Sequence, residues 1–254
     1  MFIDTHLHLS YNEGINPKEF IENAKNAGVP YLILSCCDKN SILEGLELIK
    51  EYDNLFLSVG FHPEFVSEIC DEDYSWLKEI VKSNSKIVAI GEIGLDYYWE
   101  KEKAELQKVM LKKQLDIAKE FELPVVIHTR DSVQDTYDIL TSYSLRGVIH
   151  CYSGSVEMAE KFIKIGYFLG IGGVVTFSNS KLYQVVEKVG LNNIVLETDS
   201  PYLSPVPYRG KINESKNIPI IAEKISEILD VTIDEVASVT TLNAIKLFDL
   251  NIKL

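Results

Sequence analysis

The sequence has few cysteines, a shortage of basic residues and no long apolar run, and each shortage excludes a class of protein. No stretch is long and apolar enough to cross a bilayer. The four cysteines (Cys36, Cys37, Cys70 and Cys151) lack the Cys-x₂-Cys spacing of a zinc knuckle, so reduced thiols are expected. The chain enters a strand-like run, Phe2–Leu7, directly after Met1, which leaves no room for a signal peptide. A cytoplasmic protein that does not contact membranes is therefore predicted.

The charge balance excludes a second class. Acidic residues number 38 against 25 basic ones, and the formal net charge is -13. A protein that binds nucleic acid by releasing counterions carries a basic face, so tight non-specific binding to a duplex is disfavoured. If the chain acts on nucleic acid, bound cations must supply the attraction. Hydrolysis of a phosphate ester remains open.

The pattern along the chain predicts one barrel domain over residues 1–254. There is no low-complexity tract or composition break, and 46% of the residues are hydrophobic. The predicted strands are Phe2–Leu7, Tyr31–Ser35, Phe56–Gly60, Ile87–Glu92, Val125–His128, Gly147–His150, Phe168–Gly172 and Ile194–Glu197. The predicted helices are Pro17–Ala27, Ser41–Glu51, Glu72–Lys82, Glu102–Phe121, Ser132–Ser142, Val156–Ile165, Lys181–Val189, Lys216–Leu229 and Thr232–Phe248.

The strand runs are apolar almost without alternation, as in Val125-Val126-Ile127, which is typical of parallel strands buried on both faces. The stretch from Leu106 to Phe121 instead repeats its apolar residues at helical spacing. Eight strands alternating with helices predict an α/β fold, a TIM (β/α)₈ barrel with an extra C-terminal helix after the last unit. An open, doubly wound sheet is the alternative.

The chemically informative residues lie at the ends of the predicted strands. Every histidine of the chain has such a position: His6, His8, His62, His128 and His150. Glu92 and Asp199 do too, and Glu197 is placed behind them. In a barrel these ends converge on one face, and imidazole is the commonest metal ligand. Ordinary hydrogen-bonded histidines would not share this placement, so a metal site is predicted.

Four of these residues have more specific expectations. His6 and His8 lie on the same side of a strand and can bind one cation. The carboxylate of Glu92 can bridge two cations ~3.5–4 Å apart. Asp199 could bind metal and accept a proton from water, or it could cap the following turn.

For residues expected near the entrance to the site, the sequence leaves two interpretations open. Arg130 could hold a phosphate oxygen, or pair with Asp131 or another local acid. The segment with Arg209 and Lys211 could hold a substrate phosphate or be a solvated loop. The aromatic residues 97–99 could stack on bases or belong to the core.

Six ordered motifs resemble the TatD-type metal-dependent deoxyribonucleases of the amidohydrolase-like superfamily. They are Asp4-Thr5-His6-Leu7-His8, Gly60-Phe61-His62-Pro63, Gly91-Glu92-Ile93-Gly94-Leu95-Asp96, Ile127-His128-Thr129-Arg130-Asp131, His150-Cys151-Tyr152-Ser153-Gly154 and Glu197-Thr198-Asp199-Ser200-Pro201. The resemblance implies a TIM barrel with two divalent ions that hydrolyses DNA phosphodiesters, often as a 3′ exonuclease.

By motif, the resemblance implies that His6, His8 and Asp199 hold one metal and that His128 and His150 hold the other. It also implies that Glu92 bridges the two ions and that His62 lies on the substrate side. The sequence departs from the family at residues 209–215, where Ile212 and Ser215 replace the usual Arg and Pro. That departure bears on substrate binding more than on catalysis.

The resulting hypothesis is an enzyme in which Asp199 takes a proton from the attacking water, with Glu92 and His62 as the other catalytic residues. Arg130, Arg209, Lys211 and His62 are the candidate substrate contacts. The metals are Zn, Mg or Mn by donor chemistry. The expected substrate is DNA, single-stranded or at 3′ ends, and a monomer is favoured. The alternatives are hydrolysis of another ester or amide on the same fold, such as a lactone, a phosphotriester or an aminoacyl-tRNA ester, or metal binding without catalysis.

Overall fold

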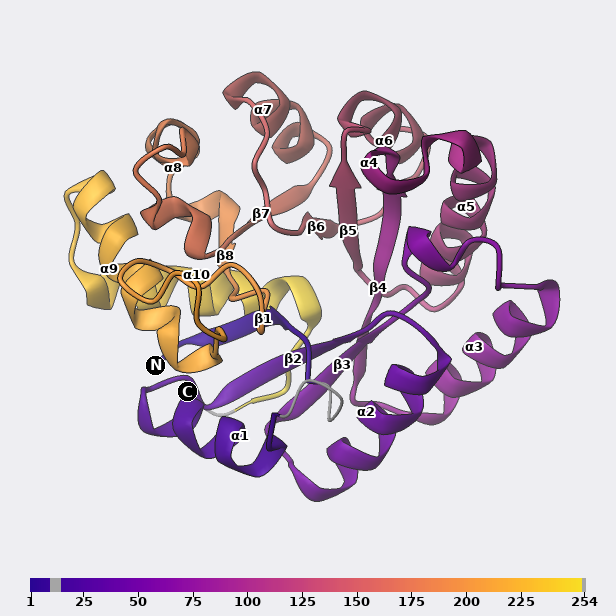
Figure 1. The fold of residues 1–254 in the computed structure, drawn as a ribbon, viewed down its shortest axis with the longest axis horizontal. Coiled ribbons are helices and arrows are strands. Elements are labelled where there is room, and N and C mark those ends of the chain that lie inside the picture. Colours follow the sequence, from indigo (N-terminus) through magenta and orange to yellow (C-terminus); the bar gives the residue numbers. More distant parts are fainter. Residues whose placement is uncertain (10–14, 253–254) are drawn as a thin grey trace.

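Eight parallel strands in sequence order form the centre of the molecule (Figure 1). A computed structural model describes residues 1–9 and 15–252. The strands are β1 (Ile3–Leu7), β2 (Tyr31–Cys36), β3 (Leu55–Val59), β4 (Ile87–Asp96), β5 (Val125–Arg130), β6 (Gly147–Ile149), β7 (Tyr167–Ile171) and β8 (Ile194–Leu196). Each is hydrogen-bonded to the next.

The first and last strands meet and nearly close the sheet. Leu7 forms a parallel bridge with Ser200. The Asp199 N–H donates to the His6 carbonyl at 3.0 Å, and the His8 N–H donates to the Ser200 carbonyl at 2.7 Å. The predicted TIM barrel is confirmed and the open-sheet alternative is wrong. This closure also brings the polar ends of β1 and β8 side by side.

Helices surround the barrel because the strands expose apolar side chains on their outer face. They are α1 (Pro17–Asn26), α2 (Lys39–Glu51), α3 (Asp71–Ser83), α4 (Tyr97–Glu100), α5 (Ala104–Glu120), α6 (Val133–Leu140), α7 (Val156–Lys164), α8 (Leu182–Val189), α9 (Ile218–Leu229) and α10 (Ile233–Phe248). None of the helices in the described part of the chain is both long and apolar enough to cross a bilayer.

One strand, β4, extends well beyond its predicted bounds, whereas the others begin and end within two residues of theirs. β4 continues past Glu92 to Asp96, and Ile93 and Leu95 in this extension are fully buried. The extension pairs with β5, with Gly94 opposite His128. The predicted strand stopped at Glu92 because a carboxylate and two glycines look like the end of an apolar run. The short helix α4, which follows directly, was not predicted.

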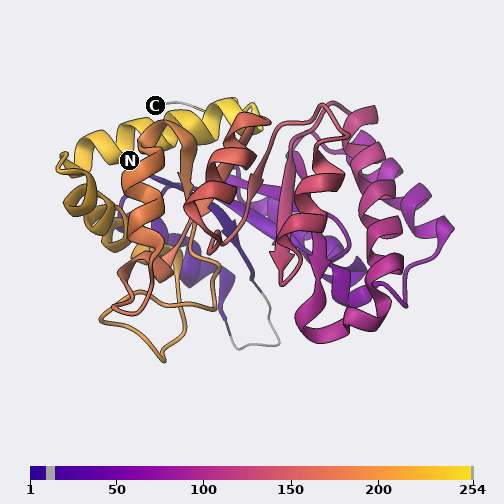
Figure 2. The same ribbon diagram turned by 90° about the horizontal axis from the view of Figure 1, so that it is seen from above.

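The two ends of the barrel have different roles. Side chains from the starts of several strands, including Ile3 and Val195, pack with Leu247 and Phe248 of the extra C-terminal helix α10. Figure 2 shows α10 along one end of the barrel and the loop after β8 (orange) at the opposite end. Conventional packing therefore closes the amino-terminal end and leaves the carboxyl ends of the strands for the site.

Two buried glutamines of α5 fix the backbone near that second end. Gln114 accepts a hydrogen bond from the Phe61 N–H at 2.7 Å and donates to the Phe61 carbonyl at 3.0 Å. Gln107, two turns earlier, makes the same pair of bonds with Asp96, at 2.8 and 2.9 Å. Both glutamines are fully buried. They hold the chain beside His62 and at the end of β4.

Replacing Gln114 with Ala should lower the free energy of unfolding by about 2–4 kcal/mol, because it leaves the buried N–H and C=O of Phe61 unpaired. Chemical denaturation measures the change. The exposed Gln184 of α8 provides the matched control, and Gln184→Ala should stay within about 0.5 kcal/mol of the parent protein. Equal effects of the two substitutions would contradict the assigned role.

Candidate metal centre

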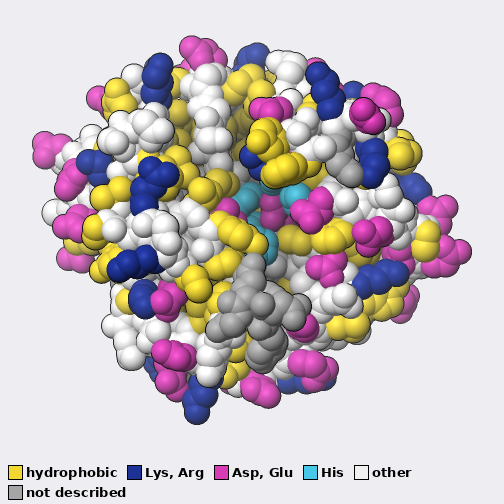
Figure 3. All heavy atoms as spheres, in the orientation of Figure 1, with side chains coloured by type: hydrophobic (Ala, Val, Ile, Leu, Met, Phe, Trp, Pro, Cys, Tyr) yellow, Lys and Arg dark blue, Asp and Glu magenta, His cyan; other side chains and the backbone are white. Residues whose placement is uncertain are grey.

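The five histidines converge at the carboxyl ends of the strands, and four of them, His8, His62, His128 and His150, line a cavity of about 920 Å³. His6 lies on β1 and His128 on β5; His8, His62 and His150 follow the ends of β1, β3 and β6. Figure 3 shows the imidazoles at the bottom of an opening bordered by acidic and hydrophobic side chains.

The carboxylate of Glu92 lies at the centre of this cluster and is only 4% exposed. Its Oε2 faces the Nε2 atoms of His6 and His8, at 3.3 and 3.8 Å. Three histidine nitrogens lie near Oε1: His128 Nδ1 at 2.8 Å, His150 Nε2 at 3.5 Å and His62 Nε2 at 3.7 Å. Each carboxylate oxygen therefore has its own set of imidazoles, which is the arrangement that a bridging ligand requires.

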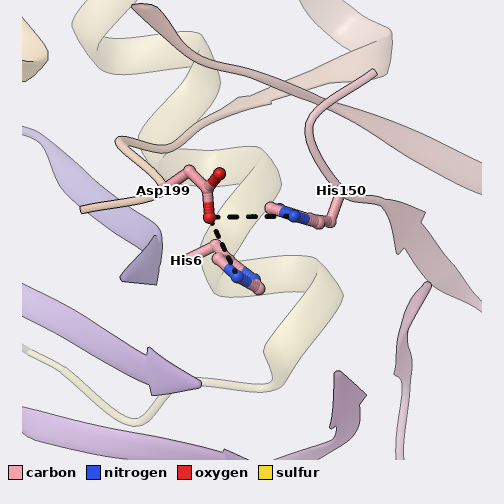
Figure 4. A group of neighbouring side chains, drawn as sticks. All are labelled: His6, His150 and Asp199. Atoms are coloured by element: carbon pink, nitrogen blue, oxygen red, sulfur yellow. Dashed lines mark ion pairs between the residues drawn. The ribbon is translucent and has the colours of Figure 1, made fainter. Parts of the chain in front are cut away.

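Asp199, which follows β8, lies close to the same rings. Its Oδ1 lies 3.7 Å from His6 Nε2, 3.8 Å from His150 Nε2 and 3.5 Å from His8 Nε2. Figure 4 shows Asp199, His6 and His150 directed toward one another, with Oδ2 pointing away from both rings. Asp199 has a φ of 57°, a left-handed conformation that Asp tolerates better than most residues.

Three groups of donor atoms could hold a metal ion among the described residues, each with atoms within 4.8 Å of one another. They are His6 with His150 and Asp199, His6 with His8 and Glu92, and His62 with Glu92 and His128. The resemblance divides the ligands differently, with His150 beside His128 and with His62 on the substrate side. In the structure His62 Nε2 lies 3.7 Å from Glu92 Oε1, within the 2.8–3.8 Å range of the other imidazoles, and the ring centroid of His62 lies 4.5 Å from that of His128.

The pKa values follow from packing acids among imidazoles. Burial alone would raise the pKa of Glu92, but His150, His128 and His6 outweigh it and hold that pKa well below its usual range. Burial opposes protonation of His128 and His150, yet their carboxylate partners raise the pKa of His128 to about 9 and that of His150 to about 10. A metal-free centre is thus a cluster of ion pairs.

Two further acids orient the rings from behind. Glu197, fully buried, lies 3.2 Å from His150 Nδ1 and accepts the Cys151 N–H at 2.5 Å. Asp96 lies 3.0 Å from His128 Nε2 through its Oδ2. A carboxylate behind an imidazole fixes its orientation and raises its basicity as a ligand. Sequence reasoning placed Glu197 behind the candidate ligands, and the structure puts it beside His150. It did not single out Asp96, although Asp96 closes a motif.

Sequence reasoning also gave no role to Cys37 or Asp4. Cys37 donates from Sγ to Glu92 Oε2 at 3.6 Å. Asp4 is fully buried, and burial raises its pKa to about 7 despite four donors. One donor is Ser215, whose hydroxyl reaches Asp4 Oδ2 at 2.6 Å. The unusual Ser215 therefore ties the loop after β8 to β1, beside His6.

The candidate substrate contacts separate into two groups. Arg130 lines the cavity, with its guanidinium over the ring of Tyr98 at 3.9 Å. Among the described residues, neither Arg209 nor Lys211 lines the cavity. The guanidinium of Arg209 lies over Phe177 at 4.0 Å. Phosphate binding by these three residues stays a prediction.

The residues present fit divalent ions on chemical grounds. Imidazole and carboxylate donors from six strand ends share one small volume. The Nε2 atoms of His6 and His8 lie 3.2 Å apart, and both face Glu92 Oε2, so nitrogen and oxygen donors of the kind that bind divalent ions point at one another. The barrel and its donor set define a metal-dependent hydrolase of the amidohydrolase type.

Comparison with known proteins gives the family. The model of the TatD related DNase family matches residues 3–249. The chain is 39% identical to the uncharacterized metal-dependent hydrolase YabD of Bacillus subtilis, over 99% of this chain and all of the relative. It therefore belongs to the TatD-related family, as the motifs predicted.

Solved structures agree. The TatD homologue YjjV of Escherichia coli superposes with a TM-score of 0.92 at 30% identity, covering 98% of each chain. A TatD family hydrolase from Entamoeba histolytica, at 24% identity and 97% coverage of each chain, gives a TM-score of 0.86 and shows the same fold.

Metal uptake should release protons at neutral pH, because the raised pKa values of His128 and His150 keep those rings protonated in the metal-free protein. The apparent affinity for Zn²⁺ should then rise about tenfold per pH unit for each proton displaced, from pH 6 to pH 8. Titration calorimetry in buffers of different ionisation enthalpy measures the proton count. An affinity independent of pH would contradict the ion-pair description.

Asp96→Asn should weaken Zn²⁺ binding about 10- to 100-fold, because it removes the carboxylate behind His128 while keeping the side-chain shape. Competition with a chromophoric chelator measures the affinity. Asp135→Asn is the matched control, since Asp135 pairs with Lys108 and Tyr97 outside the centre. Equal metal affinity of the two variants would remove Asp96 from the supporting role.

Proposed function

We propose that the chain is a divalent-metal-dependent phosphodiesterase that removes nucleotides from the 3′ end of single-stranded DNA. The observation that carries this is the two-sided contact of Glu92. One carboxylate has separate imidazoles on each oxygen, which suits a pair of cations that share a ligand. The family match supports nucleic acid as the substrate class.

His6, His8 and Asp199 would hold one ion, His128 and His150 the other, and Glu92 both. Such ions, when bound, lower the pKa of water and neutralise charge that develops on the phosphoryl oxygens. The ions would also offset the negative charge of the cavity wall. A polyanionic substrate requires this compensation, because the net charge of the chain is -13.

Asp199 is the proposed base. The surrounding histidines overcome the effect of burial and lower its pKa, so it is a carboxylate at neutral pH. Its Oδ1 faces the rings and its Oδ2 points away from them (Figure 4), so Oδ2 is the atom that we assign to the proton of water. The oxygen of that water attacks phosphorus, and the bond from phosphorus to the leaving sugar oxygen breaks.

His62 is the proposed partner of the leaving oxygen. It follows β3 at the edge of the cavity, 3.7 Å from Glu92, and its Nδ1 lies 3.0 Å from Glu64 Oε2. The Glu64 carboxylate beside Nδ1 orients the ring. Arg130, also on the cavity wall, would hold a non-bridging oxygen of the phosphate next to the scissile one.

The deciding experiment measures cleavage of single-stranded DNA labelled at the 3′ or 5′ end, with chelator and then with Mg²⁺, Mn²⁺ or Zn²⁺ restored. Progressive loss of the 3′ label that depends on metal is the expected result. Activity only on small esters, lactones or amides would favour another reaction of this barrel type. Cleavage that continues in chelator would contradict a metal-dependent mechanism.

Asp199→Asn should lower kcat on such a substrate by about 10²–10⁴-fold, because the amide cannot accept the proton. Metal analysis of the purified variant separates this from loss of an ion. The control is Asp230→Asn in the turn between α9 and α10, where an exposed Asp has a similar φ of 52°. Full activity of Asp199→Asn with metal bound would refute the assignment.

A further inference from the structure

Trp99 is a large apolar side chain that is not packed into the core. It is 70% exposed, more than any other large hydrophobic side chain in the described part of the chain. It also lines the cavity that holds the histidines. A tryptophan exposed to water at the mouth of a site offers an apolar ring face to whatever enters.

The backbone of Trp99 is fixed to the metal centre through one residue. Asp96 Oδ1 accepts the N–H groups of Tyr98 and Trp99, at 2.9 and 3.3 Å, and so caps helix α4. Its Oδ2 lies 3.0 Å from His128 Nε2. Gln107 holds the backbone of Asp96 on both sides. Tyr98 and Trp99, together called the aromatic platform, therefore have a defined backbone position relative to the reacting atoms.

A positive charge lies beside the platform. The guanidinium of Arg130 is 3.9 Å from the ring centroid of Tyr98 and 5.6 Å from that of Trp99. The two rings meet edge to face at 4.7 Å. On the other side of the cavity Tyr202 is 54% exposed. The mouth thus combines ring faces with one fixed cation.

The charges of the cavity wall make such a platform necessary for a nucleotide substrate. Six acidic residues line the cavity, and Arg130 is the only Lys or Arg among its described lining residues. Phosphates away from the metals would meet mostly negative charge. Binding of the flanking nucleotide must then come from its uncharged part, and a base offers a π-face that stacks on an aromatic ring.

We infer that Trp99 is a specificity-determining residue that stacks on an unpaired base next to the scissile phosphate, with Arg130 holding the adjoining phosphate. This inference rests on the proposed nuclease function for the substrate it names. A paired base inside a duplex has its faces covered by neighbours, so the same contact selects single-stranded DNA.

Fluorescence tests the contact itself. The chain has two tryptophans, so Trp76→Phe leaves Trp99 as the only reporter, and Trp99→Phe leaves Trp76 in α3 as the matched control. Both are made in the metal-loaded Asp199→Asn protein and titrated with short oligo(dT), with an abasic oligomer of equal length and with a blunt duplex. Oligo(dT) alone should quench Trp99 emission, and none of them should quench Trp76.

Kinetics test the consequence. In the otherwise unmodified enzyme, the ratio of kcat/KM on oligo(dT) to kcat/KM on the abasic oligomer should fall about 5- to 100-fold in Trp99→Ala. Trp99→Phe should restore most of that ratio. Damage to the metal centre would lower both rates and leave the ratio unchanged, so the ratio isolates the base contact.

Equal quenching by oligo(dT) and the abasic oligomer would overturn the inference, whether or not DNA is cleaved. So would an unchanged ratio in Trp99→Ala, which leaves the nuclease function intact. Failure of the wild-type enzyme to cleave any phosphodiester refutes the proposed function instead. In that case base-dependent quenching of Trp99 would still support a nucleobase site.

Discussion

The buried carboxylate of Glu92 among five imidazoles is the interaction on which the rest of the structure depends. An unpaired charge that is 4% exposed would cost several kcal/mol, so the fold must place compensating groups around it. The compensating histidines come from four strand ends, which only a barrel brings to one point. Closure of β1 onto β8 adds Asp199. The need to neutralise Glu92 and the barrel topology therefore select the same arrangement.

Rigidity is built in layers around this centre. Glu197 and Asp96 lie behind two of the imidazoles, and Gln107 fixes Asp96 in turn. On the other side Asp4 joins β1 to the segment after β8 through Thr198 and Ser215. Each layer uses buried hydrogen bonds between segments that are distant in sequence. Such bonds hold donor atoms in place before any ion or substrate arrives.

The proposed chemistry and the proposed choice of substrate involve different parts of the molecule. The histidines and acids lie on strand ends, where position is fixed by the barrel. Trp99, Tyr202 and the segment with Arg209 lie on connections beyond the strands, which can differ without disturbing the ligands. The departures from the family pattern follow this division. Ile212 is exposed, whereas Ser215 is buried and contributes to support.

The sequence alone was enough for the elements and for the set of candidate ligands. Nearly continuous apolar runs mark the buried strands and a period of 3.6 marks the helices, so the eight strands and, apart from α4, the helices were predicted close to their observed bounds. The end of β4 was missed because its pairing with β5 depends on a neighbour that local patterning does not reveal.

What only the tertiary structure decided is how the polar residues meet. Strand ends can be located in a sequence, but distances across a barrel depend on register and closure. Local patterning therefore does not reveal that His62 Nε2 lies 3.7 Å from Glu92, or that Asp96 joins His128 to the turn of Trp99. The physical reason is that periodicity reports which face of an element a residue occupies. Contacts between elements are set by packing and hydrogen bonds between segments far apart in the chain.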